Sequence, residues 1–220
     1  MKNILLIGSG RSAQFILDIA LLNGYQLVGF LDDTKDIGSM VSGAPVLGSL
    51  SDLIKVQENL NCELFICIQH QRVKAQIYER INQHRLPLAT LIHPQSCISP
   101  SAKIEQGVAI NAYSTVQSGA IVKSNTVIED LCSIGVNVTI DNSCTIAPQT
   151  VIAGGSKLET SCFLGAGVKV IPEVTLKQFT KVGAGAVVIN DTESHSVVAG
   201  VPAKKIRKLS KDEYFTADNT

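Results

Sequence analysis

Large aliphatic residues recur at every sixth position over the second half of the chain. The series starts at Ile92 and ends at Val188, and all seventeen of its positions are Ile, Leu or Val. A mostly small residue, such as Ala102 or Thr150, follows four positions after each of them. An amphipathic helix repeats every 3.6 residues and a strand every 2, so neither accounts for this pattern. Six residues per flat side and three sides per turn predict a triangular parallel β-helix with the aliphatic residues inside it.

The first ninety residues follow a different pattern. Apolar segments of strand composition alternate there with segments of helical spacing, at residues 3–8, 15–22, 25–33, 62–68 and 72–82. Such alternation predicts a parallel sheet that binds its ligands at the carboxyl ends of the strands. The two patterns together predict an α/β, Rossmann-like domain at residues 1–90 and an all-β domain of hexapeptide repeats at residues 91–208. The polar segment 209–220 is predicted to be a loose C-terminal tail.

The composition excludes several classes of function. The formal net charge is zero and Trp is absent, which argues against nucleic-acid binding and against an anionic membrane surface. No apolar run approaches the roughly 18 residues that span a bilayer. The N-terminal "MKNILLIGSG" reaches glycine and polar residues too early for a signal peptide, so a cytoplasmic protein is expected.

The six cysteines form no CxxC pair, and we expect buried, reduced thiols rather than disulfides or metal ligands. Cys132, Cys144 and Cys162 fall on the small inward position of the hexad, which predicts that they belong to the core. No cluster of His, Cys and acidic residues has the spacing of a metal site, so no metal is expected.

The segment "GSGRSA" at residues 8–13 follows the first predicted strand and opens the first predicted helix. Its glycines let the backbone approach a phosphate, and the helix N-terminus offers unpaired N–H groups. Two acids, Asp32 and Asp33, end the second strand about twenty residues later. A dinucleotide site needs two mononucleotide halves, and ninety residues supply little more than one. The motif therefore favours a nucleotide sugar over NAD, with a purely structural turn as the other reading.

The hexapeptide repeat followed by "GVPAKKI" at residues 200–206 resembles the acetyl-CoA-dependent left-handed β-helix acyltransferases. With "GSGRSA", "FLDD" and "LIHPQSCISPSA", the chain is similar to the bacterial nucleotide-sugar and sialic acid acetyltransferases, the family of the bacillosamine-pathway N-acetyltransferase. The resemblance implies a homotrimer that holds acetyl-CoA between neighbouring β-helices and binds the acceptor's nucleotide on the N-terminal domain. Trimerisation also follows from the prism itself, because packing three prisms in parallel buries flat sides.

The resemblance also assigns residues. Gly10, Arg11 and Ser12 would contact the acceptor, and Asp32 and Asp33 would contact its uridine, although the family often has histidine where Ser12 stands. Family cofactor positions fall on Thr145, Gly154, Ala166 and Ala184. The Gly154 N–H would stabilise the oxyanion of the thioester carbonyl. Lys204 and Lys205 follow "GVP" and either meet the phosphates of CoA or are simply solvated.

The family's catalytic histidine and its acidic partner fall on Val136 and Asn137, so the usual base is missing. The four histidines lie at positions 70, 84, 93 and 195, outside this part of the repeat. Asp130 and Asp141 are the nearby acids, and turn acids of a β-helix are usually solvated.

Losing a base affects acceptors unequally. A sugar hydroxyl depends on general-base help worth roughly a hundredfold to ten-thousandfold. A sugar amine has a pKa below that of lysine, at about 7 to 8, and its proton can leave with the CoA thiolate. Asn137 would then hold the amine or a neighbouring hydroxyl, unless it is only a polar turn residue.

The sequence therefore predicts an acetyl-CoA-dependent N-acetyltransferase that acts on a UDP- or dTDP-linked amino sugar in bacterial surface glycan biosynthesis. One alternative is a sugar or sialic acid O-acetyltransferase with an unrecognised base. The other is a non-catalytic homologue that binds acyl-CoA or a nucleotide sugar, which Val136 favours and the intact "AGG", "GAG" and "GVPAKK" segments oppose.

Overall fold

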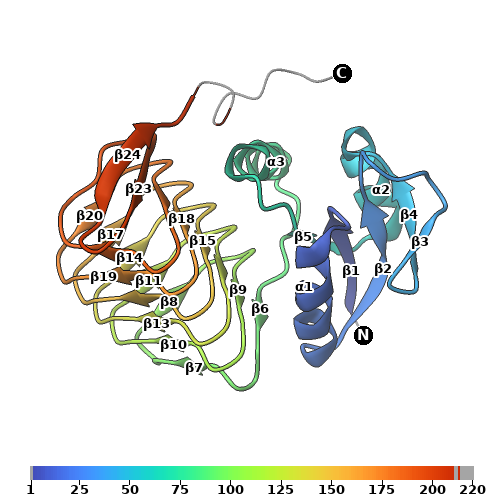
Figure 1. Ribbon diagram of the computed structural model, residues 1–220. Coiled ribbons are helices and arrows are strands. Elements are labelled where there is room, and N and C mark those ends of the chain that lie inside the picture. The colour runs from blue at the N-terminus through green and yellow to red at the C-terminus, as the bar shows by residue number, and fades with distance from the viewer. Residues whose placement is uncertain (1, 211–212, 214–220) are drawn as a thin grey trace.

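A computed structural model describes residues 2–210 and 213 of the chain (Figure 1). The N-terminal part is a five-stranded sheet in the order β3-β4-β2-β1-β5, parallel except for the pair β3 and β4. Its strands are β1 (Lys2–Ile7), β2 (Tyr25–Leu31), β3 (Met40–Val41), β4 (Ala44–Gly48) and β5 (Glu63–Ile66). Its helices are α1 (Arg11–Leu22), the 3-10 helix η1 (Leu50–Asp52), α2 (Leu53–Leu60) and α3 (Gln71–Gln83).

Helices cover both faces of this sheet. Ile16 and Ile19 of α1 pack with the residues of β1 that point to one face, such as Leu6. The side chains of α2 and α3 pack with the residues that point to the other face. The predicted α/β architecture is confirmed, because alternate residues of a strand point to opposite faces and each face is buried by a helix.

The elements β3, β4 and α2 were not predicted from the sequence. The two strands lie at one edge of the sheet, and β3 has only two residues. The start of η1, which leads directly into α2, does carry a local signal, since the backbone N–H and the hydroxyl of Ser49 both donate to Asp52 Oδ2, each at 2.9 Å. A serine followed three residues later by an acid is a capping box, a recognised sign of a helix N-terminus.

From Leu91 onward the chain forms a left-handed parallel β-helix with three faces. The first face holds β6 (Leu91–Ile92), β9 (Ala109–Ile110), β12 (Val127–Ile128), β15 (Thr145–Ile146), β18 (Phe163–Leu164), β21 (Lys181–Val182), β23 (Ser196–Ala199) and β24 (Lys204–Lys208). The second holds β7 (Cys97–Ile98), β10 (Thr115–Val116), β13 (Ser133–Ile134), β16 (Val151–Ile152), β19 (Lys169–Val170) and β22 (Val187–Val188). The third holds β8 (Lys103–Ile104), β11 (Ile121–Val122), β14 (Thr139–Ile140), β17 (Lys157–Leu158) and β20 (Thr175–Leu176).

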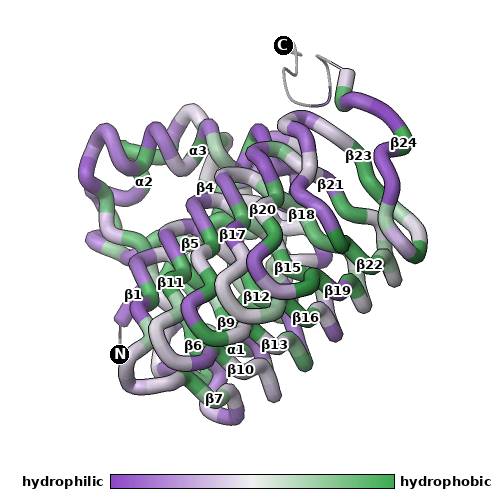
Figure 2. Tube along the Cα trace, turned by 90° about the vertical axis from the view of Figure 1, so that its left-hand side faces the viewer, coloured by the Kyte–Doolittle hydropathy of each residue, from purple (hydrophilic) through white to green (hydrophobic). Residues whose placement is uncertain are grey.

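The interior of the β-helix is built as the period of six predicts. Strands pair in register with those 18 residues away, for example Ile134 with Ile152, and both are buried. Hydrophobic and polar segments alternate along the coils in Figure 2. Cys132, Cys144 and Cys162 lie in the core as predicted, and the Cys162 thiol donates to the carbonyl of Lys177 at 3.3 Å.

One cysteine does not follow the prediction of buried thiols. Cys97 is exposed, whereas the other five are buried. Cys97 is the first residue of its two-residue strand, and that position points outward in each coil while the second residue points into the core. The prediction failed because the place in the hexad was considered for Cys132, Cys144 and Cys162 but not for Cys97.

The α/β part rests on the first face of the β-helix. Leu91, Ala109 and Val127 of that face belong to the same hydrophobic cluster as α1. Asn23 at the end of α1 donates to the carbonyl of Ile92 at 2.9 Å. Because the two parts share a core, their division near residue 90 into separate domains stays a prediction.

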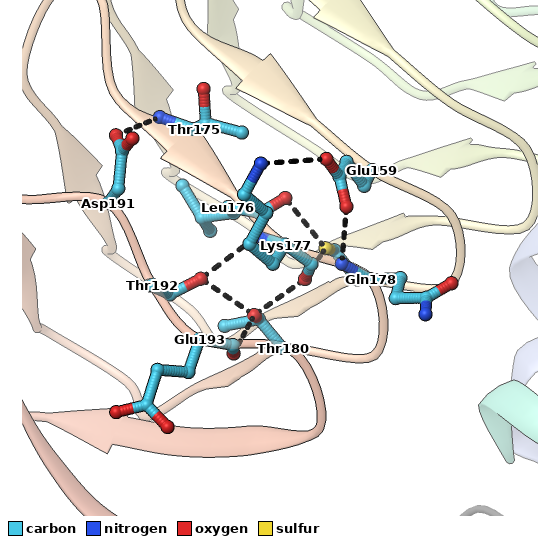
Figure 3. Close-up of polar contacts among 10 residues, drawn as sticks. Glu159, Thr175, Leu176, Lys177, Gln178, Thr180, Asp191, Thr192 and Glu193 are labelled. Carbon is cyan, nitrogen blue, oxygen red and sulfur yellow. Dashed lines mark hydrogen bonds and ion pairs between the residues drawn. The ribbon is translucent and has the colours of Figure 1, made fainter.

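The far end of the β-helix is closed by the loop of residues 190–195 (Figure 3). Asp191 Oδ1 accepts the Thr175 N–H at 2.7 Å, and Thr192 Oγ1 accepts the Lys177 N–H at 3.0 Å. The Thr192 N–H donates to the Thr175 carbonyl at 3.1 Å. The loop therefore satisfies the outer edge of β20, which has no further strand beside it on the third face.

Most of the predicted tail at 209–220 lies outside the described residues. Within the described ones, no helix combines the length and the apolar character needed to cross a bilayer.

Candidate functional site

A cavity of about 700 Å³ lies where the carboxyl ends of β1, β2 and β5 approach the β-helix. Three connecting segments line it, namely residues 8–12 after β1, 31–34 after β2 and 67–69 after β5. Glu129 lines it from the side of the β-helix. The predicted acceptor residues Gly10, Arg11, Ser12, Asp32 and Asp33 are all brought together in this cavity.

The two glycines of the first segment have different structural roles. Gly8 has φ +91°, and a Cβ there would lie 2.9 Å from Ile68 Cγ1. Gly10 has φ −75° and precedes α1, and a Cβ there would meet nothing within 4 Å. The fold therefore requires glycine at position 8, whereas Gly10 leaves open space in front of the helix N-terminus.

The N-terminus of α1 suits an anion. No side chain caps it and its first turn contains no acid. Arg11 is exposed and Ser12 is half-buried, and both line the cavity. Unpaired N–H groups, the helix dipole and a guanidinium all favour negative charge at this point.

Asp32 is an anchor of the cavity wall. Its Oδ2 accepts the N–H and hydroxyl of Ser9 at 2.8 and 2.6 Å, and its Oδ1 accepts the N–H and hydroxyl of Thr34 at 2.8 and 2.6 Å. Burial raises its pKa, but these hydrogen bonds outweigh burial and lower the pKa of Asp32 to about 2. Asp33 is exposed and, among the described residues, accepts a hydrogen bond only from the Leu50 N–H, at 2.7 Å, which leaves its second oxygen available to a ligand.

Sequence reasoning missed Glu129, which stands at the end of β12. Its backbone is fixed, since its N–H donates to the Ile146 carbonyl at 2.9 Å and its carbonyl accepts the Ser114 hydroxyl at 2.6 Å. Burial raises the pKa of its carboxyl, and the charge of Asp130 acts in the same direction. From the sequence, Asp130 and Asp141 were the acids named near the missing base. In the structure, Asp141 forms an ion pair with Lys123 at 2.6 Å. Only the packing of the α/β part on the first face reveals that Glu129 meets the cavity.

Thr145 does not lie with the other cofactor candidates. It is buried on the first face, and its hydroxyl accepts a hydrogen bond from Lys74 of α3 at 3.4 Å. Lys74 is itself fully buried and also donates to the Cys144 carbonyl at 3.2 Å. This placement gives no support to a cofactor role of Thr145.

Val136, Asn137 and Gly154 lie on the edge between the second and third faces, which we call the second edge. Val136 is exposed, and its carbonyl accepts the Gly155 N–H at 2.9 Å. In the described part of the chain the Gly154 N–H has no acceptor, so it is available to a ligand. A Cβ on Gly135 would lie 2.8 Å from the Gly154 nitrogen, so glycine is required there for the close approach of the two coils.

Asn137 has a structural role in its turn. It adopts a left-handed conformation with φ 56°, and its N–H donates to the Ser118 carbonyl at 3.0 Å. Its side-chain oxygen lies over Gly119, where an added Cβ would be only 2.1 Å from it. Asn137 is exposed, so the side chain remains accessible from outside.

Ala166 and Ala184 lie on a different edge. Both are exposed, and both belong to the turns between the first and second faces, which we call the first edge. Lys204 and Lys205 lie on β24, where Lys205 pairs with Glu193 at 2.5 Å. Of the cofactor candidates, Gly154 thus lies on one edge of the second face, and Ala166 and Ala184 lie on the other.

No histidine of the described residues lines the cavity. His195 stacks on Phe179, with ring centroids 5.1 Å apart, and His70 precedes α3. Residues 2–210 and 213 also contain no group of three or more His, Cys, Asp or Glu side chains able to hold a metal ion.

Comparison with known proteins points to one group. The PglD N-terminal domain family matches residues 3–81. A histidine-to-asparagine mutant of perosamine N-acetyltransferase from Caulobacter crescentus, in complex with CoA and GDP-perosamine, is 27% identical with a TM-score of 0.88. That similarity covers 94% of this chain and 98% of that one.

Two further relatives agree with this comparison. The acetyltransferase domain of PglB from Neisseria gonorrhoeae, in complex with acetyl coenzyme A, is 28% identical over 93% of this chain and 99% of that chain, with a TM-score of 0.85. Serine acetyltransferase of Salmonella typhimurium is 30% identical over 147 residues, which is 60% of this chain and 48% of the relative. The chain thus spans about half the length of the serine acetyltransferases that it matches.

Proposed function

We propose, from the premise that the chain belongs to the nucleotide-sugar acetyltransferases of the hexapeptide-repeat family, that it transfers the acetyl group of acetyl-CoA to an amine of a nucleotide-linked sugar. The observation that carries this proposal is the similarity, over nearly the whole chain, to an N-acetyltransferase whose complex holds CoA and GDP-perosamine. The reaction would serve bacterial surface glycan biosynthesis in the cytoplasm.

The cavity is proposed to bind the nucleotide sugar. The N-terminus of α1 with Gly10, Arg11 and Ser12 would take the diphosphate, because this point favours negative charge. Asp33 would accept hydrogen bonds from the nucleoside through its free oxygen. Asp32, which was assigned to the uridine together with Asp33, would mainly hold the wall of the cavity through the four hydrogen bonds that it accepts.

Acetyl-CoA is proposed to lie between two copies of the chain. Gly154 on the second edge would donate its N–H to the thioester carbonyl, while Ala166 and Ala184 on the first edge would contact the remainder of CoA. Since these edges lie on opposite sides of one face, a neighbouring copy is needed to place them beside each other. Lys204 and Lys205 would meet the phosphates.

The exposed apolar residues favour a trimer formed through the second face. Val151 lies on that face, and others follow its two edges, namely Tyr113, Leu131, Val136, Ile171 and Ile189. The first face is covered by the α/β part, and the outward residues of the third face include Lys103 and Lys157. An exposed apolar patch of this kind marks an interface between proteins.

The chemistry favours an amine over a hydroxyl. Val136 cannot accept a proton, and a hydroxyl acceptor depends strongly on a base. An amine of pKa about 7 to 8 is partly neutral at physiological pH, so positioning and an oxyanion contact contribute most of the acceleration. Asn137 is exposed beside Val136 and would orient the acceptor.

The test is free-thiol release from acetyl-CoA with UDP-, dTDP- and GDP-linked amino sugars, each measured beside its hydroxyl analogue. Turnover with one amine and none with its hydroxyl analogue is expected. Turnover on a hydroxyl would instead show an O-acetyltransferase. Tight binding of CoA and nucleotide without turnover on any acceptor would show a non-catalytic homologue, the outcome that Val136 favours.

A further inference from the structure

We propose that Glu129 is the proton acceptor of this reaction, taking the place of the histidine that is absent at Val136. The inference rests on the proposed function, which supplies the amine acceptor. Glu129 lies on the first edge, on the opposite side of the second face from Asn137 and Gly154, so it would act together with the Asn137 and Gly154 of a neighbouring copy.

The position of Glu129 supports this role. Of the described residues that line the cavity it alone belongs to the β-helix, and Gly10, Arg11 and Ser12 line the same space. With the nucleoside at Asp33 and the diphosphate at the N-terminus of α1, as proposed, the sugar would extend toward the remaining wall of the cavity, which Glu129 lines. The backbone of Glu129 is held on both sides by neighbouring coils, which places its side chain on a rigid element, as a catalytic group requires.

The surroundings of Glu129 raise the pKa of its carboxyl above the usual range. Burial raises the pKa of Glu129, the charge of Asp130 raises it further, and a hydrogen bond from Gln69 and the charge of Lys74 oppose them. The buried thiol of Cys132 also lies within electrostatic range. A carboxylate whose pKa is raised toward the working pH is a more effective general base than an ordinary surface one. Across the cavity the other charged groups are Arg11, Asp32 and Asp33.

The step balances without any further reactant. The nitrogen lone pair attacks the thioester carbonyl carbon, a C–N bond forms, and the C–S bond breaks. The N–H proton passes to the Glu129 carboxylate and from there to the departing CoA thiolate. The products are the acetamido sugar and free CoA, and Glu129 returns to its ionised form.

A purely structural role for Glu129 would have a different effect on stability when the carboxylate is removed. Lys74 is buried and its charge interacts with that of Glu129, so the carboxylate could serve only as its counter-charge. Removing a needed counter-charge would destabilise the protein. Removing a half-buried carboxylate that is kept there for catalysis would stabilise the protein at neutral pH, because the folded state raises the pKa of Glu129 and disfavours its ionised form.

The experiment compares wild type, Glu129→Gln, Glu129→Asp and the control Glu58→Gln, which removes an exposed carboxylate from α2. The kcat for thiol release is measured from pH 5.5 to 9 with acetyl-CoA and the amino-sugar nucleotide that wild type uses. Binding of the matching nucleoside diphosphate (UDP, dTDP or GDP) is measured by calorimetry. Tm is measured by differential scanning fluorimetry at pH 7.5.

For Glu129→Gln we expect kcat to fall at least about a hundredfold, with the nucleotide Kd within threefold of wild type and Tm unchanged or higher. In wild type, protonation of Glu129 should make kcat fall toward low pH. This fall should be absent in Glu129→Gln. Glu129→Asp should recover part of the rate, and Glu58→Gln should match wild type.

Two results would overturn this inference and leave the proposed function intact. One is a kcat of Glu129→Gln within threefold of wild type. The other is a fall in kcat accompanied by lower Tm and weaker nucleotide binding, which would assign Glu129 a structural role. If wild type acetylates no amino sugar at all, the proposed function fails and the inference fails with it.

Discussion

Both the N–H and the hydroxyl of Ser9 donate to the same oxygen of Asp32, at 2.8 and 2.6 Å. The contact joins the segment after β1 to the segment after β2, so two walls of the cavity are connected through one carboxylate. Because the hydrogen bonds favour the ionised form, the pKa of Asp32 is lowered to about 2 despite burial.

Asp32→Asn should therefore lower the free energy of unfolding at pH 7 by roughly 1–3 kcal/mol. A carboxyl with a lowered folded-state pKa contributes stability above its unfolded pKa and loses it as the pH falls toward 2. The difference between wild type and variant should accordingly shrink between pH 4 and pH 2 in urea unfolding experiments. Asp33→Asn is the matched control, with a smaller effect because Asp33 accepts a single bond. Equal losses in the two variants would contradict the anchoring role.

The two glycines of "GSGRSA" should respond differently to alanine. Gly8→Ala places a side chain at φ +91° and close to Ile68, and we expect it to cost roughly 1–3 kcal/mol of stability. Gly10→Ala meets no atom within 4 Å and should leave Tm within about 2 °C of wild type while weakening nucleotide diphosphate binding. Thermal melting and calorimetry check both variants. Unchanged binding by Gly10→Ala would argue against a phosphate in front of α1.

Lys74→Met should change how stability depends on pH. Burial lowers the pKa of Lys74 to about 8, so folding disfavours the charged amine. As the pH falls from 10 to 8, the unfolded chain binds more protons than the folded one, and wild type loses up to about 1.4 kcal/mol per pH unit. The variant has no such group, so wild type should lose stability relative to it over this range. Parallel curves in urea titrations at pH 8, 9 and 10 would show that Lys74 keeps an ordinary pKa.

Val151→Glu should break the proposed trimer. The substitution places a carboxylate in the middle of the second face, where an interface would bury it. Light scattering after size exclusion should show a loss of trimer at micromolar concentration, with the far-UV circular dichroism spectrum unchanged and acetyl transfer reduced. Lys157→Glu, an exposed substitution on the third face of the same coil, should remain trimeric. Dissociation by both variants, or by neither, would place the interface elsewhere.

The β-helix was predictable because its signal is local and repeated. Each coil places an aliphatic residue such as Ile134 inside, and 18 residues later Ile152 does the same, so the pattern alone defines the register. The strands β3 and β4 offered no such repetition. The position of β4 depends on pairing with β2, a contact that no short stretch of sequence encodes, and β3 in turn pairs only with β4 among the described strands.

The candidate site was only partly predictable. Gly10 and Asp33 follow strands whose ends converge, so a general rule of parallel sheets brings them together. Glu129 was missed because nothing in its own hexad distinguishes it from other turn acids. Its importance arises from how the α/β part sits on the first face, through contacts such as that of Asn23 with Ile92.

The loop that carries Asp191 and Thr192 also affects how copies of the chain meet. A β-helix that stopped without it would present a bare row of N–H and C=O groups, onto which the coil of another molecule can add strand by strand. Stacking of that kind has no natural limit and leads to fibres and aggregates. By occupying the edge of β20 with its own side chains, the chain blocks end-to-end growth there. Association is then directed to the sides of the prism, where it can close into a small assembly.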